Sequence, residues 1–227
     1  MSRWRFDLLG DSALSVRVGD DASLVTNARV HRLAHALRRA SVAGVRDVVP
    51  GMRDLLVHVD PLRCEIRQVE SVVRAAMAAA DDHQDTRPPV DRDVDDAIIE
   101  IPVTYGGASG PDLDHVAAAC GLDVEEACRR HAAVEYVVCF VGFLPGFPYL
   151  GLLDASLRLP RRATPRTRVP AGSVAIAGEY TGIYPAASPG GWHLIGRTDV
   201  TLFDVAAEPP ARLAPGTRVR FVPQLVG

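Results

Sequence analysis

Hydrophobic and polar positions over residues 1–80 follow two different periods, and these predict two kinds of element. Short apolar-rich segments bounded by Gly-Asp or Pro-Gly pairs predict strands, and apolar residues that recur close to every 3.6 positions predict helices. In chain order we predict strands over 4–9 and 13–18, a helix over 22–40, strands over 45–49 and 55–59, and a helix over 65–80. This ββαββα order favours a small α/β sandwich of the α+β class.

Beyond residue 96 the pattern predicts a strand, two helices and then mainly strands. Asp112 is placed to cap a helix that ends at Gly121, and Asp123 with Glu126 forms the capping-box pattern of a second helix that runs to about His131. The predicted strands cover residues 97–103, 134–141, 173–177, 192–196, 200–204 and 218–223. Many short strands separated by Gly/Pro turns favour a β-barrel or a β-sandwich.

A polar segment separates these two regions. Residues 81–96 contain seven aspartates and a Pro-Pro pair, and almost no apolar side chain. Such a composition is typical of a connection between domains. We therefore predict an N-terminal α+β domain over residues 1–84, an acidic, proline-containing linker over 85–96 and a C-terminal β-barrel domain over 97–227.

The stretch from residue 140 to residue 198 is rich in glycine and proline, with eight glycines and seven prolines between Gly142 and Gly191. Glycine permits positive φ angles and close backbone approach, whereas proline fixes φ and removes a hydrogen-bond donor. This composition argues against ordinary strands and helices and predicts tightly shaped loops on a rigid scaffold. Because such loops often carry binding and catalytic residues, we expect the functional site here.

The overall composition restricts the class of protein. The chain has 227 residues, of which 48% are hydrophobic and 23% charged, as in soluble globular proteins. Its net charge of −3 offers no basic footprint for nucleic acid, and it has no apolar run of about 18 residues that would predict a membrane span. The first residues lack the apolar core of a signal peptide. We therefore expect a cytoplasmic protein that binds neither nucleic acid nor membrane.

Cysteine and lysine usage narrows the chemistry further. The four cysteines form no Cys-x-x-Cys pair, and we expect free, buried thiols in a reducing compartment. The chain has no lysine, and all 25 of its Lys/Arg-type residues are arginines. This excludes a Walker-A lysine, a Schiff-base lysine and a biotin-carrying lysine. A phosphate or carboxylate would be held by arginine side chains or by backbone N–H groups.

Two familiar catalytic arrangements are not supported by the spacing. His31 and His35 lie four positions apart on a predicted helix, but the residue after His31 is not the glutamate of a His-Glu-x-x-His zinc site. We expect two surface histidines there and no metal site. A serine hydrolase would combine Ser173 or Ser188 with His193, yet the chain has no Gly-x-Ser-x-Gly turn. A strand start and a Ser-Pro turn account for the two serines.

The Gly/Pro-rich stretch gathers arginine and aromatic side chains. Five arginines within eleven residues could hold a carboxylate or phosphate through paired hydrogen bonds, although a solvated surface explains such a cluster equally well: Arg158, Arg161, Arg162, Arg166 and Arg168. Aromatic residues between Pro-Gly turns are expected to form either pocket walls or core. His193 is the titratable imidazole of this stretch and a candidate for acid/base chemistry or ligand binding.

Several motifs together resemble one known family. The matching segments are GFLPGFPYLG at 142–151, PRRATPRTRVPAGSV at 160–174, TGIYP at 181–185, SPGGW at 188–192, IGRT at 195–198, YGG at 105–107, GPDL at 110–113 and PGM at 50–52. On these residues the chain resembles the 5-oxoprolinase B-subunit family, also called the KipI or allophanate hydrolase subunit 1 family. The resemblance covers essentially the whole chain.

The resemblance implies an N-terminal α+β domain followed by a cyclophilin-like β-barrel domain. It implies two partners, a KipA-like C subunit (allophanate hydrolase subunit 2) and a LamB/YcsF-like A subunit. The B and C subunits together resemble the carboxyltransferase region of urea carboxylase. The assembly would hydrolyse 5-oxoproline to glutamate, using ATP with Mg²⁺ held largely by the partner subunits. Two alternatives stay open, a KipI-like inhibitor of a histidine kinase and an enzyme component that acts on another small amide such as a urea derivative.

Within this interpretation we expect an anion site and a pocket in the C-terminal domain. Phosphorylation of the amide oxygen would supply a leaving group, and arginines would offset the developing charge. Tyr180 stands where the family usually has glutamine, which bears on the substrate, and His193 stands where Gln or Asn is more common, which weakens an obligatory acid/base role. The anion-holding candidates are Arg161, Arg162 and Arg166, and the pocket candidates are Phe147, Tyr149, Tyr180, Tyr184 and Trp192.

Overall fold

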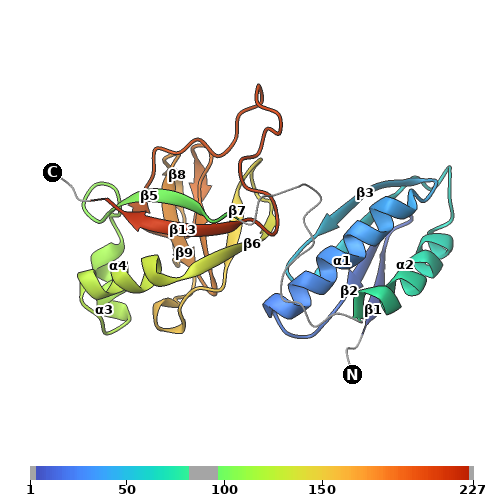
Figure 1. Ribbon diagram of the computed structural model, residues 1–227, viewed down its shortest axis with the longest axis horizontal. Helices are drawn as coiled ribbons and strands as arrows, with labels where there is room; N and C mark the ends of the chain where they lie inside the picture. Colours follow the sequence, from blue (N-terminus) through green and yellow to red (C-terminus); the bar gives the residue numbers. More distant parts are fainter. Residues whose placement is uncertain (1–3, 82–96, 225–227) are drawn as a thin grey trace. The chain divides into compact units, whose positions relative to one another are not determined.

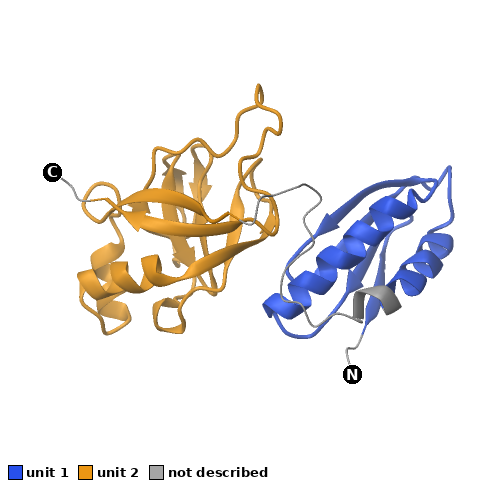
Figure 2. Cartoon of the chain, in the orientation of Figure 1, with its two compact units in different colours: residues 1–93 blue, residues 94–227 orange. Residues whose placement is uncertain are grey.

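The computed structural model describes residues 4–81 and 97–224. The chain divides into two compact units, residues 1–93 and 94–227 (Figure 2). The predicted linker over residues 85–96 lies outside the described residues, so the predicted domain boundaries stay a prediction. None of the described helices has the length and apolar character needed to cross a membrane.

The N-terminal unit has the predicted ββαββα order (Figure 1). Its elements are β1 (Arg5–Leu9), β2 (Ala13–Arg17), α1 (Leu24–Ala40), β3 (Val45–Pro50), β4 (Asp54–Val59) and α2 (Ile66–Asp81). The strands form an antiparallel sheet in the order β1-β2-β4-β3. Apolar side chains of both helices, such as Leu33 and Val73, share one buried cluster with those of the sheet. The helical periodicity therefore marks the faces that are buried.

The C-terminal unit contains a closed β-barrel, which confirms the predicted fold class (Figure 1). Its elements are β5 (Ile99–Tyr105), α3 (Leu113–Ala119), α4 (Val124–Ala133), β6 (Glu135–Val141), β7 (Pro148–Gly151), the 3₁₀ turn η1 (Ala155–Leu157), β8 (Arg166–Val169), β9 (Ser173–Ala177), β10 (Tyr180–Ile183), β11 (Ser188–Gly190), β12 (His193–Arg197) and β13 (Arg218–Pro223). The barrel order is β10-β7-β6-β13-β5-β12-β9, and β9 pairs with β10 to close it. β5 and β13 pair in parallel, whereas the other barrel neighbours are antiparallel.

The expectation that the Gly/Pro-rich stretch avoids ordinary strands is wrong, because β7, β8, β10 and β11 all lie within it. Glycine is required at some positions of these strands because neighbouring atoms leave no room for a Cβ. A Cβ on Gly182 of β10 would lie 2.9 Å from Phe147 Cζ, and a Cβ on Gly151 of β7 would lie 2.8 Å from Cys139 Sγ. Both distances are shorter than a side chain can adopt without a shift of its neighbours. These glycines allow β7 and β10 to pack closely against neighbouring side chains.

The predicted strand over residues 200–204 is not present, since the segment makes only a single bridge between Phe203 and Ala211. The segment between β12 and β13 projects from the barrel (Figure 1). Leu202 and Leu213 are buried, whereas Val205 is 87% exposed. The apolar residues of this segment therefore anchor a long loop rather than form a strand.

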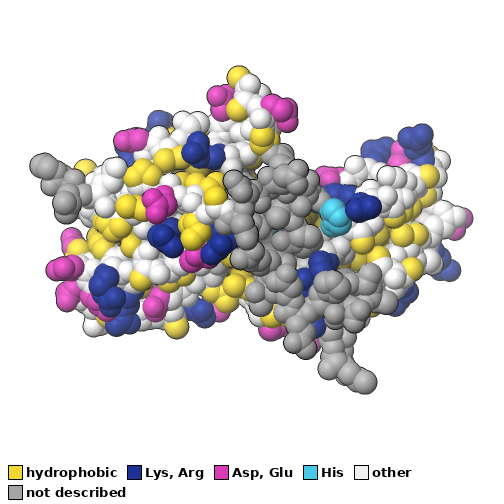
Figure 3. All heavy atoms as spheres, viewed as in Figure 1, with side chains coloured by type: hydrophobic (Ala, Val, Ile, Leu, Met, Phe, Trp, Pro, Cys, Tyr) yellow, Lys and Arg dark blue, Asp and Glu magenta, His cyan; other side chains and the backbone are white. Residues whose placement is uncertain are grey.

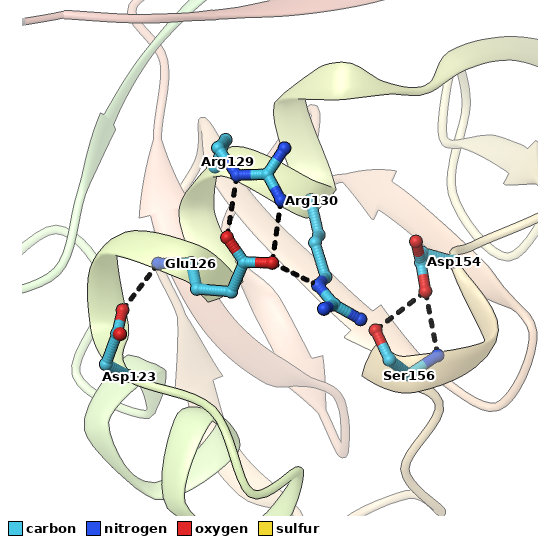
Figure 4. Close-up of polar contacts among 6 residues, drawn as sticks. All are labelled: Asp123, Glu126, Arg129, Arg130, Asp154 and Ser156. Atoms are coloured by element: carbon cyan, nitrogen blue, oxygen red, sulfur yellow. Dashed lines mark hydrogen bonds and ion pairs between the residues drawn. The ribbon is translucent and has the colours of Figure 1, made fainter.

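The two predicted caps of α3 and α4 are only partly confirmed. Asp123 Oδ1 accepts a hydrogen bond from Glu126 N at 2.7 Å, as expected, but the Glu126 carboxylate binds Arg129 and Arg130 instead of completing a capping box (Figure 4). These hydrogen bonds lower the pKa of Glu126 to about 2. Asp112 precedes α3, but its side chain makes no capping bond. Its carboxylate binds two arginines instead.

Arg130 extends from α4 toward the turn that holds Asp154 and Ser156 (Figure 4). Asp154 Oδ1 accepts hydrogen bonds from Ser156 Oγ at 2.7 Å and from Ser156 N at 2.8 Å, and these bonds lower the pKa of Asp154, with a smaller contribution from the charge of Arg130. Electrostatic attraction thus links α4 to the start of η1 on the barrel surface. Figure 3 shows arginine and acidic side chains interspersed over the visible face of this unit.

Candidate functional site

Most of the predicted pocket aromatics lie in a second buried cluster of the barrel. Phe147, Tyr184 and Trp192 are at most 5% exposed, and Phe147 makes edge-on ring contacts with Tyr184 at 5.1 Å and with Trp192 at 5.5 Å. Tyr149 and Tyr180 are partly buried at the edge of this cluster, with ring centroids 6.0 Å apart. The five candidates therefore lie together, but Phe147, Tyr184 and Trp192 form part of the packed core, and only Tyr149 and Tyr180 are partly exposed to solvent.

Two of the predicted anion-holding arginines bind a carboxylate of this same chain. Arg162 Nη1 lies 2.8 Å from Asp112 Oδ1, and Arg166 donates to both carboxylate oxygens, at 2.8 and 2.7 Å. The backbone N–H of Leu194 donates to Asp112 Oδ2 at 2.7 Å. This ion-pair cluster of Asp112, Arg162 and Arg166 joins the start of α3, the arginine-rich segment and β12. The sequence indicated the two arginines but not their partner.

The charge of Asp112 is stabilised by this arrangement. Burial alone raises the pKa of the carboxyl group, but hydrogen bonds from Arg166 and Leu194 N, together with the charges of Arg166 and Arg162, outweigh it and hold the pKa below its usual value. Asp112 is only 5% exposed, so two guanidinium groups compensate one desolvated carboxylate. The cluster therefore carries a net positive charge.

A pocket of about 490 Å³ includes Arg162 in its wall. The lining residues are His115, Leu159, Pro160, Arg161, Arg162, Ala163, Thr164 and His193. Arg161 is exposed, whereas His193 is 5% exposed and lies with its ring 5.7 Å from that of His115 in a stacked arrangement. The structure thus groups His193 with Arg161 and Arg162, and it places the aromatic candidates outside this wall.

The hydrogen bond of His193 defines its tautomer. Nε2 lies 2.9 Å from the Pro160 carbonyl oxygen, which can only accept, so Nε2 carries the proton and Nδ1 is an acceptor in the neutral ring. Nδ1 of His193 is buried and has no hydrogen-bond partner within residues 4–81 and 97–224, and the same is true of Arg162 Nε. Each of these two pocket-lining residues therefore holds one buried polar atom that no described residue pairs.

The donor set does not fit a metal ion or a nucleotide of the common lysine-bound kind. Among the described residues no group of three or more His, Cys, Asp or Glu side chains gathers as a metal site requires. The carboxylate that contacts the pocket-lining Arg162, that of Asp112, is already bound by two arginines.

His31, which was expected on a helix surface, is buried with 5% exposure, which corrects that expectation.

A buried polar chain that sequence analysis missed crosses the barrel core. Thr181 Oγ1 donates to the Ala175 carbonyl oxygen at 3.1 Å, so it accepts from His131 Nε2 at 2.8 Å, and His131 Nδ1 accepts from the Tyr105 hydroxyl at 2.7 Å. Complete burial lowers the pKa of His131 to about 3. The residues come from α4, β5, β9 and β10, so no spacing in the sequence could have grouped them.

The four cysteines are free, as expected, but only Cys139 is buried, and Cys64, Cys120 and Cys128 are partly exposed. Burial raises the pKa of the Cys139 thiol to about 12. The thiolate is the reactive form of cysteine, so Cys139 is unreactive at neutral pH and acts as an apolar packing group.

Comparison with known proteins places these features in a family. Residues 4–213 match the family described as "Carboxyltransferase domain, subdomain C and D". The chain is 44% identical to the 5-oxoprolinase B subunit of Escherichia coli O157:H7, with 100% of this chain and 99% of that protein covered. It is 37% identical to the 5-oxoprolinase B subunit of Bacillus subtilis (strain 168), with 97% and 92% covered. The chain belongs to the 5-oxoprolinase B-subunit family.

A solved structure related to this member of the 5-oxoprolinase B-subunit family shows the same fold within a longer polypeptide. The protein TTHA0988 is 38% identical, with a TM-score of 0.78 over 95% of this chain, but the match covers only 41% of that solved chain. This chain therefore spans less than half of TTHA0988. The family resemblance inferred from the sequence motifs is confirmed by these matches.

Proposed function

We propose that this chain is the B subunit of an ATP-dependent 5-oxoprolinase, a cytoplasmic assembly that hydrolyses 5-oxoproline to glutamate together with an A and a C subunit. The observation that carries the proposal is the match to the 5-oxoprolinase B subunit of Escherichia coli O157:H7 over the full length of both chains. The relatives are subunits by name, which favours a role in a multi-subunit enzyme rather than activity of the chain alone.

The chemistry of the pocket is compatible with a small amide. An amide is hard to hydrolyse because negative charge must build up on its oxygen, and fixed cationic donors lower that cost. Arg161 and Arg162 line the pocket, and the net positive charge of the ion-pair cluster adds to their field. In this proposal the chain binds and orients the amide and stabilises the developing negative charge.

ATP with Mg²⁺ would activate the amide oxygen by phosphorylation. The chain has no lysine, and its described residues gather no carboxylate cluster for a cation. We therefore assign ATP and Mg²⁺ to the partner subunits. The match covers only 41% of TTHA0988, which supports a separate partner chain that corresponds to the rest of that polypeptide. We assign this partner to the C subunit.

The proposal is tested by reconstitution. The chain is mixed with purified A and C subunits, ATP, Mg²⁺ and 5-oxoproline, and glutamate is measured over time. We expect glutamate from the complete mixture, and none from this chain alone or from the mixture that lacks it. Equal glutamate with and without this chain would overturn the proposal.

A further inference from the structure

The sheet of the N-terminal unit has two edge strands, β1 and β3, and the edge of β3 is blocked (Figure 1). The Val48 N–H donates to Asp47 Oδ1 at 2.7 Å, and the Val48 carbonyl oxygen accepts from Arg38 Nη2 at 2.8 Å. Pro50 has no N–H, and a register shift between Val45 and Asp47 interrupts the pairing with β4. Such devices keep a strand edge from pairing with another chain.

The other edge strand, β1, is open along its outer side. It pairs with β2, and no other strand of the described residues pairs with it. At the two ends of β2, the Ser12 carbonyl oxygen and the Val18 N–H bond to the segment that contains β4, so by alternation the odd-numbered residues of β2 bond to β1. These pair with odd-numbered residues of β1, and the backbone groups of Phe6 and Leu8 therefore point outward. Leu8 is 58% exposed, so apolar surface accompanies the open backbone edge.

We propose that β1 pairs antiparallel with β1 of a second copy of this chain, about a two-fold axis at Phe6. In this register the two Phe6 residues pair with each other, and Arg5 of each copy lies opposite Asp7 of the other. The two four-stranded sheets then form one continuous sheet. Two-fold interfaces of this kind, in which the same surface of each copy takes part, are the commonest in homodimers.

The charges of β1 select this register from those that the backbone permits. Hydrogen bonds between the copies require outward-facing residues to lie opposite one another, so the axis passes through a residue and not between two residues. An axis at Arg5 or at Asp7 puts a pair of like charges at its centre, which is destabilising. An axis at Leu8 or Leu9 pairs neither charge with an opposite charge of β1. The axis at Phe6 pairs opposite charges twice.

The side chains of β1 are arranged for this pairing in the single copy. Arg5 Nε lies 2.9 Å from Asp7 Oδ2, and the two side chains are 66% and 42% exposed, so both remain accessible to the second copy. On the other face of the strand, the Phe6 ring packs against the buried cluster, with Arg74 Cζ 4.0 Å from its centroid. Cross-strand pairs of aromatic residues and of opposite charges both stabilise antiparallel sheets.

Sedimentation velocity of the full chain, from about 5 to about 200 µM, measures the association. Five paired residues in each copy make a small interface, so we expect a monomer–dimer equilibrium in the micromolar range. Amide hydrogen exchange followed by NMR locates the interface. Exchange at Phe6 and Leu8 should slow as the concentration rises, whereas the Asp7 amide, which faces β2, should not change.

Charge variants test the register. Asp7→Arg puts an arginine opposite Arg5 in both cross-strand pairs and should weaken the dimer at least about tenfold. The double variant Arg5→Asp/Asp7→Arg exchanges the two charges, restores opposite pairs and should return the affinity to within about threefold of wild type. Asp11→Arg, on an exposed residue of the turn after β1, makes the same change in net charge and should leave the affinity unchanged. Equal thermal unfolding of the variants establishes that each is folded.

Three outcomes would overturn the pairing. They are a monomer at about 200 µM, a dimer in which exchange at Phe6 and Leu8 does not depend on concentration, and equal weakening by Asp7→Arg and by the double variant. Protection of Phe6 and Leu8 only after the A and C subunits are added also overturns it, because the edge then binds a different chain. Glutamate formation in the reconstituted mixture is measured separately, so a monomeric chain that supports it leaves the proposed function intact.

Discussion

Arg166 and Asp112 are joined by two parallel hydrogen bonds although 54 positions of sequence separate them. The carboxylate also binds Arg162 and the backbone N–H of Leu194. Removal of its charge therefore affects the start of α3, the arginine-rich segment and β12 at once. The bond pattern makes Asp112 the centre of the ion-pair cluster and the support of the pocket wall.

Replacement of Asp112 by alanine is expected to lower the free energy of unfolding of the C-terminal unit by about 3 kcal/mol, because two partly buried guanidinium groups lose their counter-charge. The measurement is urea unfolding followed by Trp192 fluorescence in a Trp4→Phe background, so that the signal comes from this unit. Asp114→Ala, on an exposed residue of α3, is the control and should change stability by no more than about 0.5 kcal/mol. Equal effects of the two substitutions would contradict the role of Asp112.

His131 should make the stability of the same unit depend on pH. Its folded-state pKa of about 3 lies below the usual value of 6.5, so below pH 6.5 the unfolded chain takes up a proton that the folded chain does not. This contribution is fully present above pH 6.5 and is lost at about 1.4 kcal/mol per pH unit as the pH falls toward 3. His131→Gln removes the titrating group, so the variant should lose about 2 kcal/mol less than wild type between pH 6.5 and pH 5. Parallel stability curves for the two proteins would refute the assignment.

Gly182 should tolerate no side chain. A Cβ there would lie 2.9 Å from both Phe147 Cζ and the Pro148 carbonyl oxygen, so Gly182→Ala is expected to cost about 1–3 kcal/mol through overpacking. Gly142→Ala is the matched control, since a Cβ there meets no atom within 4 Å and the change should cost no more than about 0.5 kcal/mol. Thermal unfolding of both variants provides the comparison, and a similar melting temperature for the two would contradict the packing argument.

Asp123 caps α4 through its hydrogen bond from Glu126 N. Loss of such a cap typically costs about 1 kcal/mol, so Asp123→Ala should destabilise the unit by that amount. The control is Glu125→Ala, because Glu125 is exposed in the first turn of the same helix and accepts no capping bond. Hydrogen exchange of the first-turn amides of α4 checks the cause, and only the Asp123 variant should show faster exchange at Glu126.

The parts of the fold that were predicted from sequence are those in which burial follows a local period. The whole ββαββα order belongs to this class, and so does β13, whose predicted bounds agree with the structure. In these elements each buried side chain is set by its own position along the strand or helix. Residues 200–204 show the limit, because apolar residues that anchor a loop resemble a short strand in sequence.

The parts that were not predicted depend on contacts between distant segments. β7 and β10 contain glycine because of the atoms packed against them, which no local pattern reveals. Asp112 precedes α3 at the position of a cap, but its carboxylate oxygens accept hydrogen bonds from two arginines of a distant segment instead of from the first backbone N–H groups of the helix. Three of the predicted site residues, Arg161, Arg162 and His193, line one pocket, whereas the carboxylate of Asp112 and the unpaired buried atoms of this region required the structure.

The parallel pairing of β13 with β5 sets the order in which this unit can be completed during synthesis. β13 also pairs with β6, so until residues 218–223 have left the ribosome, β5 and β6 each lack a neighbour. Unpaired strand edges are sites of aggregation, and the nascent chain carries two of them for as long as the last strand is missing. We therefore expect truncation before Arg218 to yield insoluble protein, and chaperone demand to fall once the final strand is translated.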